Sequence, residues 1–151
     1  MTTARTHHPA LPYYISSDLA DFELKRVHGW ISATYWARDI PFDILKRSFE
    51  NSLSFGLFHD VDGQVGCARM ITDRATFAYL GDVYIAEEAR GQKLGRWLMD
   101  AIMAHPDLQG LRRMMLATSD MHALYRQVGF TELSKPEIMM EIAVPDIYSR
   151  Q

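Results

Sequence analysis

The chain has 151 residues, 48% of them hydrophobic and 23% charged, which is the composition of one soluble globular domain with a sizeable core. Its formal charge of −3 at pH 7 excludes the global positive field that attracts nucleic acid or anionic membranes. Its one cysteine, Cys67, excludes an intrachain disulfide and a thiolate metal motif.

The N-terminal segment, residues 1–11, lacks the apolar run of a secretory signal. No stretch of the sequence approaches the roughly 20 consecutive apolar residues that cross a bilayer. We therefore expect a flexible lead-in over residues 1–11 and a single domain over residues 12–151. We also expect a cytoplasmic protein with neither a nucleic-acid nor a membrane partner.

The first part of the domain indicates a short strand followed by two helices. Tyr13–Ser16 is a β-branched and aromatic run typical of a strand. Asp18 stands where it can cap a helix with an apolar side, and Ile31–Ala37 would prolong that region. Pro41 then occupies the expected first turn of a second helix, PFDILKRSFENS, where its missing N–H does no harm.

At Leu53 the apolar period changes from helical to extended. Leu53–His59 and Gln64–Thr72 flank the dipeptide Asp62-Gly63, a strong hairpin signal. Thr76–Ile85 is a third extended run with Gly81 in its middle, and a glycine inside a strand often marks a bulge or a close backbone approach. These residues predict three consecutive strands.

The rest of the chain alternates helices and strands. From Leu94 to Ile102 the apolar residues recur at i, i+3, i+4, i+7 and i+8, which predicts an amphipathic helix that ends before Pro106. The order of all the elements predicts a mixed α/β sheet with helices on both faces. The elements expected after this helix are a strand at 113–118, a short helix at 121–128 capped by Asp120 and ended by Gly129, and strands at 130–133 and 138–142.

The turn ARGQKLG, residues 89–95, combines two glycines with cations just where a helix starts. Free backbone N–H groups and the helix dipole favour an anion there, and Arg90, Lys93 and Arg96 add positive charge. Gly91 and Gly95 would let the backbone approach the anion closely. The alternative is an ordinary helix start with solvated cations. The turn matches neither GxxxxGK[ST] nor GxGxxG, which disfavours a nucleotide site of either type.

This turn, following VYIAEE, resembles the [QR]-x-x-G-x-[GA] motif of the GNAT superfamily of CoA-dependent N-acyltransferases. Arg90 takes the first place and Gly95 the last, while Lys93 stands where the middle glycine usually falls. LYRQVGF, residues 124–130, resembles the superfamily's later Y-x-x-x-G-F element. The resemblance extends over roughly residues 13–142. It implies the GNAT fold, with a mixed, mostly antiparallel sheet of about six to seven strands flanked by about four helices.

The resemblance also implies a co-substrate and roles for particular residues. Acetyl-CoA would bind with its pyrophosphate on the backbone amides of the turn, and Tyr125 would point at its sulfur. The amides around Val83 and Tyr84 would provide the oxyanion donor and pair with the pantetheine arm. The residues expected to contact the cofactor are Val83, Tyr84, Ile85, Arg90, Gly91, Gln92, Lys93, Leu94, Gly95 and Arg96.

Acyl transfer to an amine needs a base, because alkyl ammonium groups have a pKa near ~10. Asp82 is one candidate, since a charge inside an apolar strand is costly unless it is paired or used. Its alternative role is a structural hydrogen bond to a neighbouring strand or turn. Asp73 is a second carboxylate near the expected acceptor site, although ITDRATF favours a turn role for it. Tyr79 lies near the place where some GNAT members have a basic carboxylate.

Tyr35 and Trp36 are the expected acceptor-pocket residues, with core packing as the alternative. The scattered histidines do not form a metal-ligand pattern, so we expect no metal. We expect an N-acetyltransferase that moves an acetyl group directly, in a ternary complex, to a primary amine of a small molecule or a peptide. The alternative is a non-catalytic acyl-CoA-binding or sensor module. A homodimer is compatible with this fold.

Overall fold

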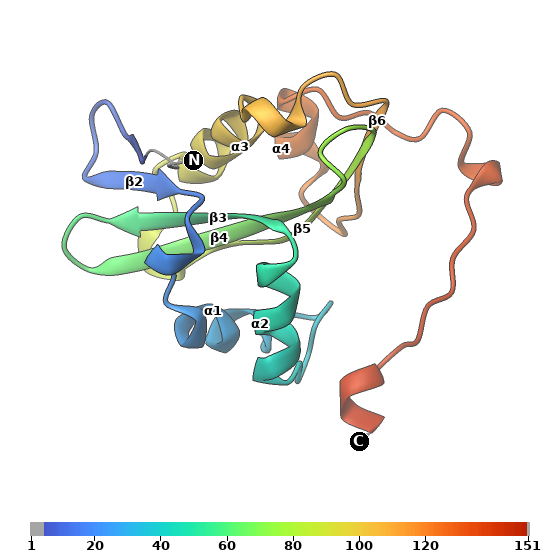
Figure 1. Ribbon diagram of the computed structural model, residues 1–151, viewed down its shortest axis with the longest axis horizontal. Coiled ribbons are helices and arrows are strands. Elements are labelled where there is room, and N and C mark those ends of the chain that lie inside the picture. The colour runs from blue at the N-terminus through green and yellow to red at the C-terminus, as the bar shows by residue number, and fades with distance from the viewer. Residues whose placement is uncertain (1–4, 151) are drawn as a thin grey trace.

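The computed structural model describes residues 5–150 and centres on a six-stranded sheet (Figure 1). Neighbouring strands are antiparallel except β5 and β6, which are parallel. Sheet order follows chain order: β1 (Thr6–His7), β2 (Tyr13–Ser16), β3 (Leu53–His59), β4 (Gly63–Thr72), β5 (Phe77–Ile85) and β6 (Arg113–Leu116).

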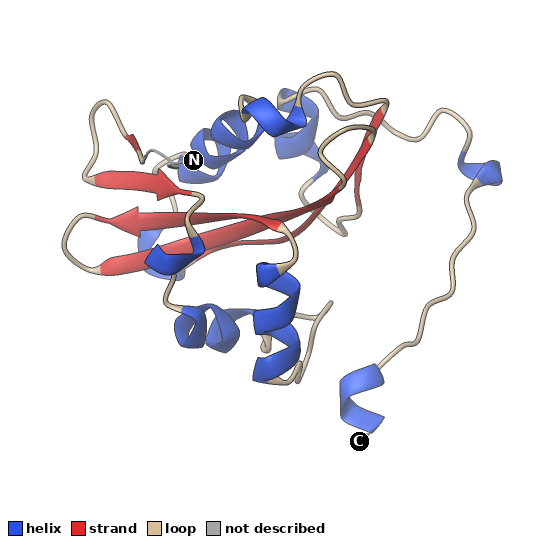
Figure 2. Cartoon of the chain, in the orientation of Figure 1, coloured by secondary structure: helices blue, strands red, loops and turns tan. Residues whose placement is uncertain are grey.

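Helices cover both faces of this sheet (Figure 2). α1 (Leu24–Ile31) and α2 (Phe42–Glu50) lie on one face, and α3 (Leu94–Met103) and α4 (His122–Gln127) lie on the other. The expected mixed α/β fold is therefore confirmed. Within residues 5–150, no helix is long and apolar enough to cross a membrane.

Two apolar clusters hold these layers together, one on each face of the sheet. The larger joins the sheet to α3, whose Leu98 and Ile102 are fully buried. The smaller joins α1 and α2 to the opposite face, where Cys67 of β4 is fully buried beside them. Because β3 is buried over nearly all its length, the central strands form a fixed platform for the residues that follow β5.

The first helix differs from its prediction. Asp18 does form a cap, accepting the Ala20 N–H at 3.0 Å, but the helix it starts is a three-residue 3-10 turn. α1 begins only at Leu24. The break follows from a contact that local sequence does not reveal: Glu23 and Gln64 each use the side chain to bond the other's backbone N–H, both at 2.7 Å. Residues 32–41 then form turns, so the prolonged helix was wrong.

The C-terminal strands expected at 130–133 and 138–142 are absent. Residues 136–138 form a short 3-10 helix and the remainder is irregular. The sheet has an unexpected strand instead, β1, which pairs with β2. β1 lies within residues 1–11, which were expected to be a flexible lead-in, and residues 1–4 lie outside the described residues. Asp120 does not cap α4, whereas Gly129, with φ +111°, follows it as expected. We call residues 131–147 the C-terminal arm.

Candidate active site

β5 and β6 separate at the centre of the molecule, and the candidate site lies where they part. Residues 77–80 of β5 pair with residues 113–116 of β6. Beyond these pairs β5 continues to Ile85, and the chain after β6 turns toward α4. Two cavities of about 500 and 510 Å³ lie beyond this point. Met121 lines both of them, so the two spaces adjoin. We call them the cleft cavity and the turn cavity.

The turn cavity lies against the segment that joins β5 to α3. Its other wall comes from α4, through Leu124 and Gln127, which the sequence did not indicate. Seven of the expected cofactor residues line it: Ile85, Arg90, Gly91, Lys93, Leu94, Gly95 and Arg96.

The turn that lines this cavity has an unusual backbone. Gly91 and Lys93 both have left-handed backbones, with φ of +84° and +62°. The first hydrogen bond of α3 runs from the Trp97 N–H to the Lys93 carbonyl, so the amides of residues 94–96 precede the helical ladder. With the positive end of the helix dipole, such amides suit an anionic group.

The two glycines leave space that a side chain would fill. A Cβ added at Gly91 would meet no other atom within 4 Å, and one at Gly95 only Leu124 Cδ2 at 3.9 Å. Since both glycines line the cavity, the added atom would occupy room now open to a ligand. A glycine-containing cradle at a helix N-terminus fits the pyrophosphate of a CoA molecule.

Several side chains around this cradle already form hydrogen bonds with other residues of the chain. Arg90 donates from Nε to the Ile85 carbonyl at 2.8 Å, and Arg96 donates to Asp100 at 3.0 Å. Gln92 turns inward to the Tyr13 hydroxyl at 3.1 Å, and the Tyr84 ring stacks on Trp30. The side chains of Gln92 and Tyr84 therefore do not line the turn cavity.

The cleft cavity draws its walls from five parts of the chain. Tyr35 and Trp36 come from the α1–α2 loop, as a T-shaped pair with ring centroids 5.1 Å apart. Arg69 comes from β4, and Tyr125 from α4. Residues 79–83 of β5, including Val83, and residues 116–121 complete the lining. Val83 thus lines the cleft cavity rather than the turn cavity.

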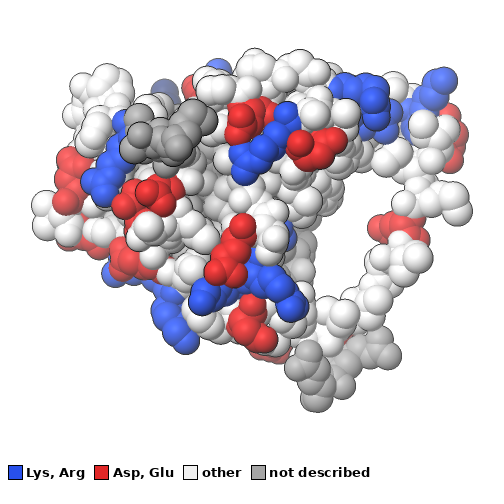
Figure 3. Space-filling view, viewed as in Figure 1, with Lys and Arg blue, Asp and Glu red and all other residues white. Residues whose placement is uncertain are grey.

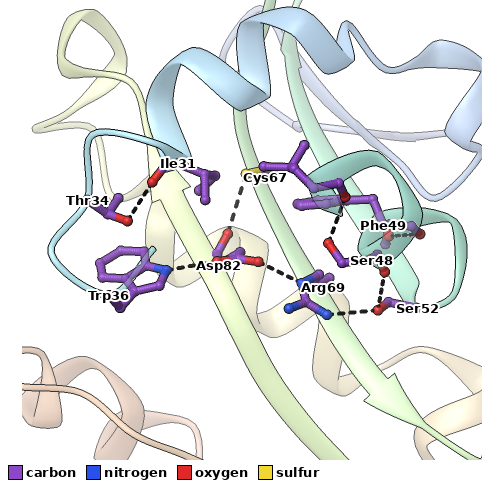
Figure 4. Close-up of polar contacts among 11 residues, drawn as sticks. Ile31, Thr34, Trp36, Ser48, Phe49, Ser52, Cys67, Arg69 and Asp82 are labelled. Atoms are coloured by element: carbon purple, nitrogen blue, oxygen red, sulfur yellow. Dashed lines mark hydrogen bonds and ion pairs between the residues drawn. The ribbon is translucent and has the colours of Figure 1, made fainter. Parts of the chain in front are cut away.

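A β-bulge places Asp82, one of the lining residues, between Trp36 and Arg69 (Figure 4). Arg69 pairs with Gly81 and Cys67 with Tyr84, so a single β4 residue faces two residues of β5. Asp82 takes the extra place with a left-handed φ of +52°, a conformation that aspartate tolerates better than most residues. The irregularity expected beside Gly81 is therefore present, one residue later.

Both carboxylate oxygens of Asp82 are engaged. Oδ1 accepts the Trp36 indole N–H at 2.8 Å, and Oδ2 accepts the Arg69 Nε–H at 2.6 Å. Arg69 also donates to the Ser52 hydroxyl at 3.1 Å. Each oxygen keeps a further acceptor position, but a proton on Asp82 would weaken its ion pair with Arg69, and the carboxylate already ties the α1–α2 loop to two strands.

Sequence reasoning missed Arg69. The signal was present, because Arg69 is a charge inside the apolar run QVGCARMIT, the same pattern that singled out Asp82. The two side chains are 19% and 9% exposed, and such charges are tolerated when they pair. Two charges in adjacent strands could therefore have been read as one ion pair.

Tyr125 of α4 lies in the wall of the cleft cavity. Its side chain is buried, lines the cleft cavity and packs edge-on against Phe130. Burial raises the pKa of the Tyr125 phenol, and the nearby Asp120 and Tyr35 raise it further. The hydroxyl therefore stays protonated at neutral pH and is available as a hydrogen-bond donor.

Asp73 does not come together with the other expected site residues. It lies in the β4–β5 turn, where its carboxylate accepts the N–H groups of Ala75, Thr76 and Phe77. The Thr76 hydroxyl and these amides lower the pKa of Asp73. Asp73 lines neither cavity, so its place is that of a turn residue. Among the described residues, no group of three or more metal-type ligands occurs.

Comparison with known proteins agrees with this geometry. Residues 51–132 match the family model described as "Acetyltransferase (GNAT) domain". The Gibberella zeae protein named "Putative acetyltransferase FG08082" is 33% identical over 155 residues, covering 87% of this chain and 86% of that protein.

Solved structures give the same result. A crystal structure from Xanthomonas campestris pv. campestris, described as belonging to the GNAT family, is 49% identical and superposes with a TM-score of 0.87, covering 95% of this chain and 99% of that one. A Clostridium acetobutylicum structure described as a "predicted acetyltransferase with acetyl-CoA" shares the fold, with a TM-score of 0.63 at 15% identity over 87% of this chain and 94% of that one. The chain therefore belongs to the GNAT family of acetyltransferases.

Proposed function

We propose that the protein is an N-acetyltransferase that moves the acetyl group of acetyl-CoA to a primary amine of a small molecule or a peptide. The observation that supports this most is the meeting of two cavities at Met121, one lined by the start of α3 and the other lined by Tyr125. The relative from Clostridium acetobutylicum supports acetyl-CoA as the co-substrate.

The turn cavity is the proposed place for the anionic part of acetyl-CoA. The amides of Leu94, Gly95 and Arg96 would hold its pyrophosphate, and Lys93, which lines the same cavity, would add a positive charge. Bound acetyl-CoA supplies the acetyl group as a reactive thioester. Tyr125 would donate a hydrogen bond to the departing thiolate, a role that its protonated phenol can fill.

The cleft cavity is the proposed acceptor site. Tyr35 and Trp36 are 62% and 46% exposed, and their ring faces can attract an amine while it is still a cation. Direct transfer in a ternary complex is supported by the state of the only cysteine: Cys67 is fully buried, and burial raises the pKa of its thiol well above the usual range. Such a thiol is a poor nucleophile, so an acetyl-enzyme intermediate on Cys67 is disfavoured.

Isothermal titration tests the first half of this proposal. Acetyl-CoA is expected to bind with a dissociation constant between about 1 µM and 1 mM, the usual range of substrate affinities. Thiol release in the presence of a panel of amines tests the second half. Binding without release for any amine would favour the alternative, a non-catalytic acyl-CoA-binding module, and the absence of binding would contradict both.

For Asp82 we propose a positioning role, in which the carboxylate fixes Trp36 and Arg69. Asp82→Asn is expected to lower kcat/KM about tenfold while leaving the rise of kcat/KM with pH where it is in the wild type. The fall reflects an Arg69 cation that has lost its charged partner beside the cavity.

Trp36→Phe is the matched control for Asp82→Asn, because it removes the indole hydrogen bond to Asp82 and keeps a smaller aromatic ring, while the Asp82–Arg69 ion pair stays intact. It should give a smaller loss of kcat/KM with the same pH profile. If the rise with pH disappears in Asp82→Asn alone, Asp82 is the base, as the sequence predicted.

A further inference from the structure

Asp120 lies in the wall of the cleft cavity, and the fold makes little use of its carboxylate. The cap that the sequence predicted for it is not formed: the hydroxyl of Thr118 accepts the N–H of Met121, the residue before α4, at 3.1 Å. Within residues 5–150, the Asp120 carboxylate accepts one hydrogen bond, from the adjacent Ser119 hydroxyl at 3.4 Å, and forms no ion pair. Its charge therefore has no cationic partner in the described part of the chain.

The other two charges in the wall of the cleft cavity neutralise each other. Arg69 Nε donates to Asp82 Oδ2 at 2.6 Å, so this pair adds no net charge to the cavity. On the face seen in Figure 3, acidic and basic side chains are interspersed, without a large area of one sign. Because salt also screens distant charges, a ligand in the cleft responds mainly to the nearby carboxylate of Asp120.

Apolar and aromatic side chains make up much of the remaining wall. Tyr35 and Trp36 offer ring faces from the α1–α2 loop, and Leu80 and Val83 line the cavity from β5. A site of this kind holds the apolar body of a small ligand, while a few polar groups fix its orientation. The cleft therefore combines one negative charge with apolar walls.

Asp120 also lies close to the proposed reaction centre. Its negative charge raises the pKa of the Tyr125 phenol, which places the two side chains near each other in the cavity that both of them line. Met121, the next residue, lines the turn cavity as well. An amine held at Asp120 would therefore lie beside the point where the two cavities meet.

We propose that Asp120 binds the acceptor as an ammonium ion, and that the acceptor is a primary amine with an apolar body and no carboxylate next to the amine. This inference rests on the N-acetyltransferase function proposed above. Alkyl amines are mainly ammonium ions at neutral pH, and an ammonium ion forms a strong, charge-assisted hydrogen bond with a carboxylate. The carboxylate of an α-amino acid would meet the like charge of Asp120 and be rejected.

Matched acceptors test the predicted class, because an amine and its parent amino acid differ by one carboxylate. Tyramine with tyrosine, and tryptamine with tryptophan, are two such pairs. The wild type is expected to acetylate each amine with a kcat/KM at least about 100-fold higher than that for its amino acid. Equal values would overturn the proposal and leave acetyl transfer itself intact. So would a failure of both amines while other amines of the panel are acetylated.

Asp120→Asn removes the charge and nearly preserves the shape of the side chain. It should raise the KM for tyramine at least tenfold, change kcat by less than about threefold, and reduce the preference for tyramine over tyrosine at least tenfold. Asp120→Glu keeps the charge and should keep the preference. Glu137→Gln is the matched control, because it removes one negative charge from the C-terminal arm and lines neither cavity. It should behave as the wild type.

Binding measurements separate this proposal from the proposed function. Asp120→Asn should bind acetyl-CoA as the wild type does, because Asp120 does not line the turn cavity. With CoA bound, the wild type should bind tyramine at least about tenfold more tightly than Asp120→Asn does, whether or not transfer occurs. Weaker binding of acetyl-CoA by the variant, or equal binding of tyramine, would overturn the proposal. If tyramine binds as expected and no amine is acetylated, the N-acetyltransferase function fails and the role of Asp120 stands.

Discussion

Tyr125→Phe is expected to lower kcat by about 100-fold and to change the KM for acetyl-CoA by less than about threefold. The substitution removes one hydroxyl from a buried ring that lines the cleft cavity, and the ring keeps its packing against Phe130. The loss should fall on kcat because a donor to the departing thiolate acts mainly in the transition state. Steady-state kinetics with the best amine from the panel measure both constants.

Tyr79→Phe is the matched control for Tyr125→Phe. Tyr79 lines the same cavity from β5, so the two variants lose the same atom from the same space. Tyr79→Phe should leave kcat within about threefold of the wild type. An equal effect of both variants would remove Tyr125 from the mechanism.

The pKa of Tyr125 also predicts how kcat should depend on pH. Burial, Asp120 and Tyr35 all raise that pKa above its usual value of 10.0. A raised pKa keeps the phenol protonated to higher pH, so a loss of kcat caused by its ionisation should have its midpoint above pH 10. A fall in kcat near pH 8 would have to come from another group.

The sequence predicted the three central strands and the helices α2, α3 and α4 to within two residues, and it failed at α1, at β1 and at the two C-terminal strands. The three central strands lie within one residue of their expected bounds, because alternation and the Asp62-Gly63 turn are local signals. α1 was misplaced because the contact between Glu23 and Gln64 spans 41 residues. The two C-terminal strands, at 130–133 and 138–142, were expected from short apolar runs. They are absent from the fold because a strand forms only when it pairs with a neighbour, and local sequence does not show whether such a neighbour is available.

The candidate site also has a part that the sequence predicts and a part that it does not. The turn cavity could be predicted, since its glycines, cations and helix start are contiguous in the chain. The cleft cavity could be predicted only in part, because it joins the α1–α2 loop, β4, β5 and α4 across the sheet. Asp82 was noticed for its charge, but the bulge that gives it two partners depends on the register between β4 and β5.

The backbone at Lys93 shows why the GNAT motif usually has glycine at this place. Glycine, the usual residue there, has no Cβ. The structure shows a left-handed backbone at Lys93, which costs a residue with a Cβ about 1 kcal/mol. The turn therefore tolerates strain at Lys93 while it keeps glycine at the two places where an added Cβ would fill ligand space.

Gly95→Ala should therefore change stability and binding in opposite directions. Gly95 lies in the first turn of α3, so alanine should stabilise the fold by about 0.5–1 kcal/mol through its higher helix propensity. The added Cβ enters the turn cavity, where only Leu124 lies within 4 Å, and should weaken acetyl-CoA binding at least tenfold. Denaturant unfolding and isothermal titration measure the two effects.

Gly29→Ala is the control that separates these effects. Gly29 lies within α1, on the other face of the sheet from the turn cavity, and an added Cβ there meets nothing within 4 Å. It should give the same gain in stability with unchanged affinity for acetyl-CoA. Because the two variants make the same chemical change in two helices, only the position of the Cβ differs between them. If Gly95→Ala binds acetyl-CoA as tightly as Gly29→Ala does, the pyrophosphate does not lie on the start of α3.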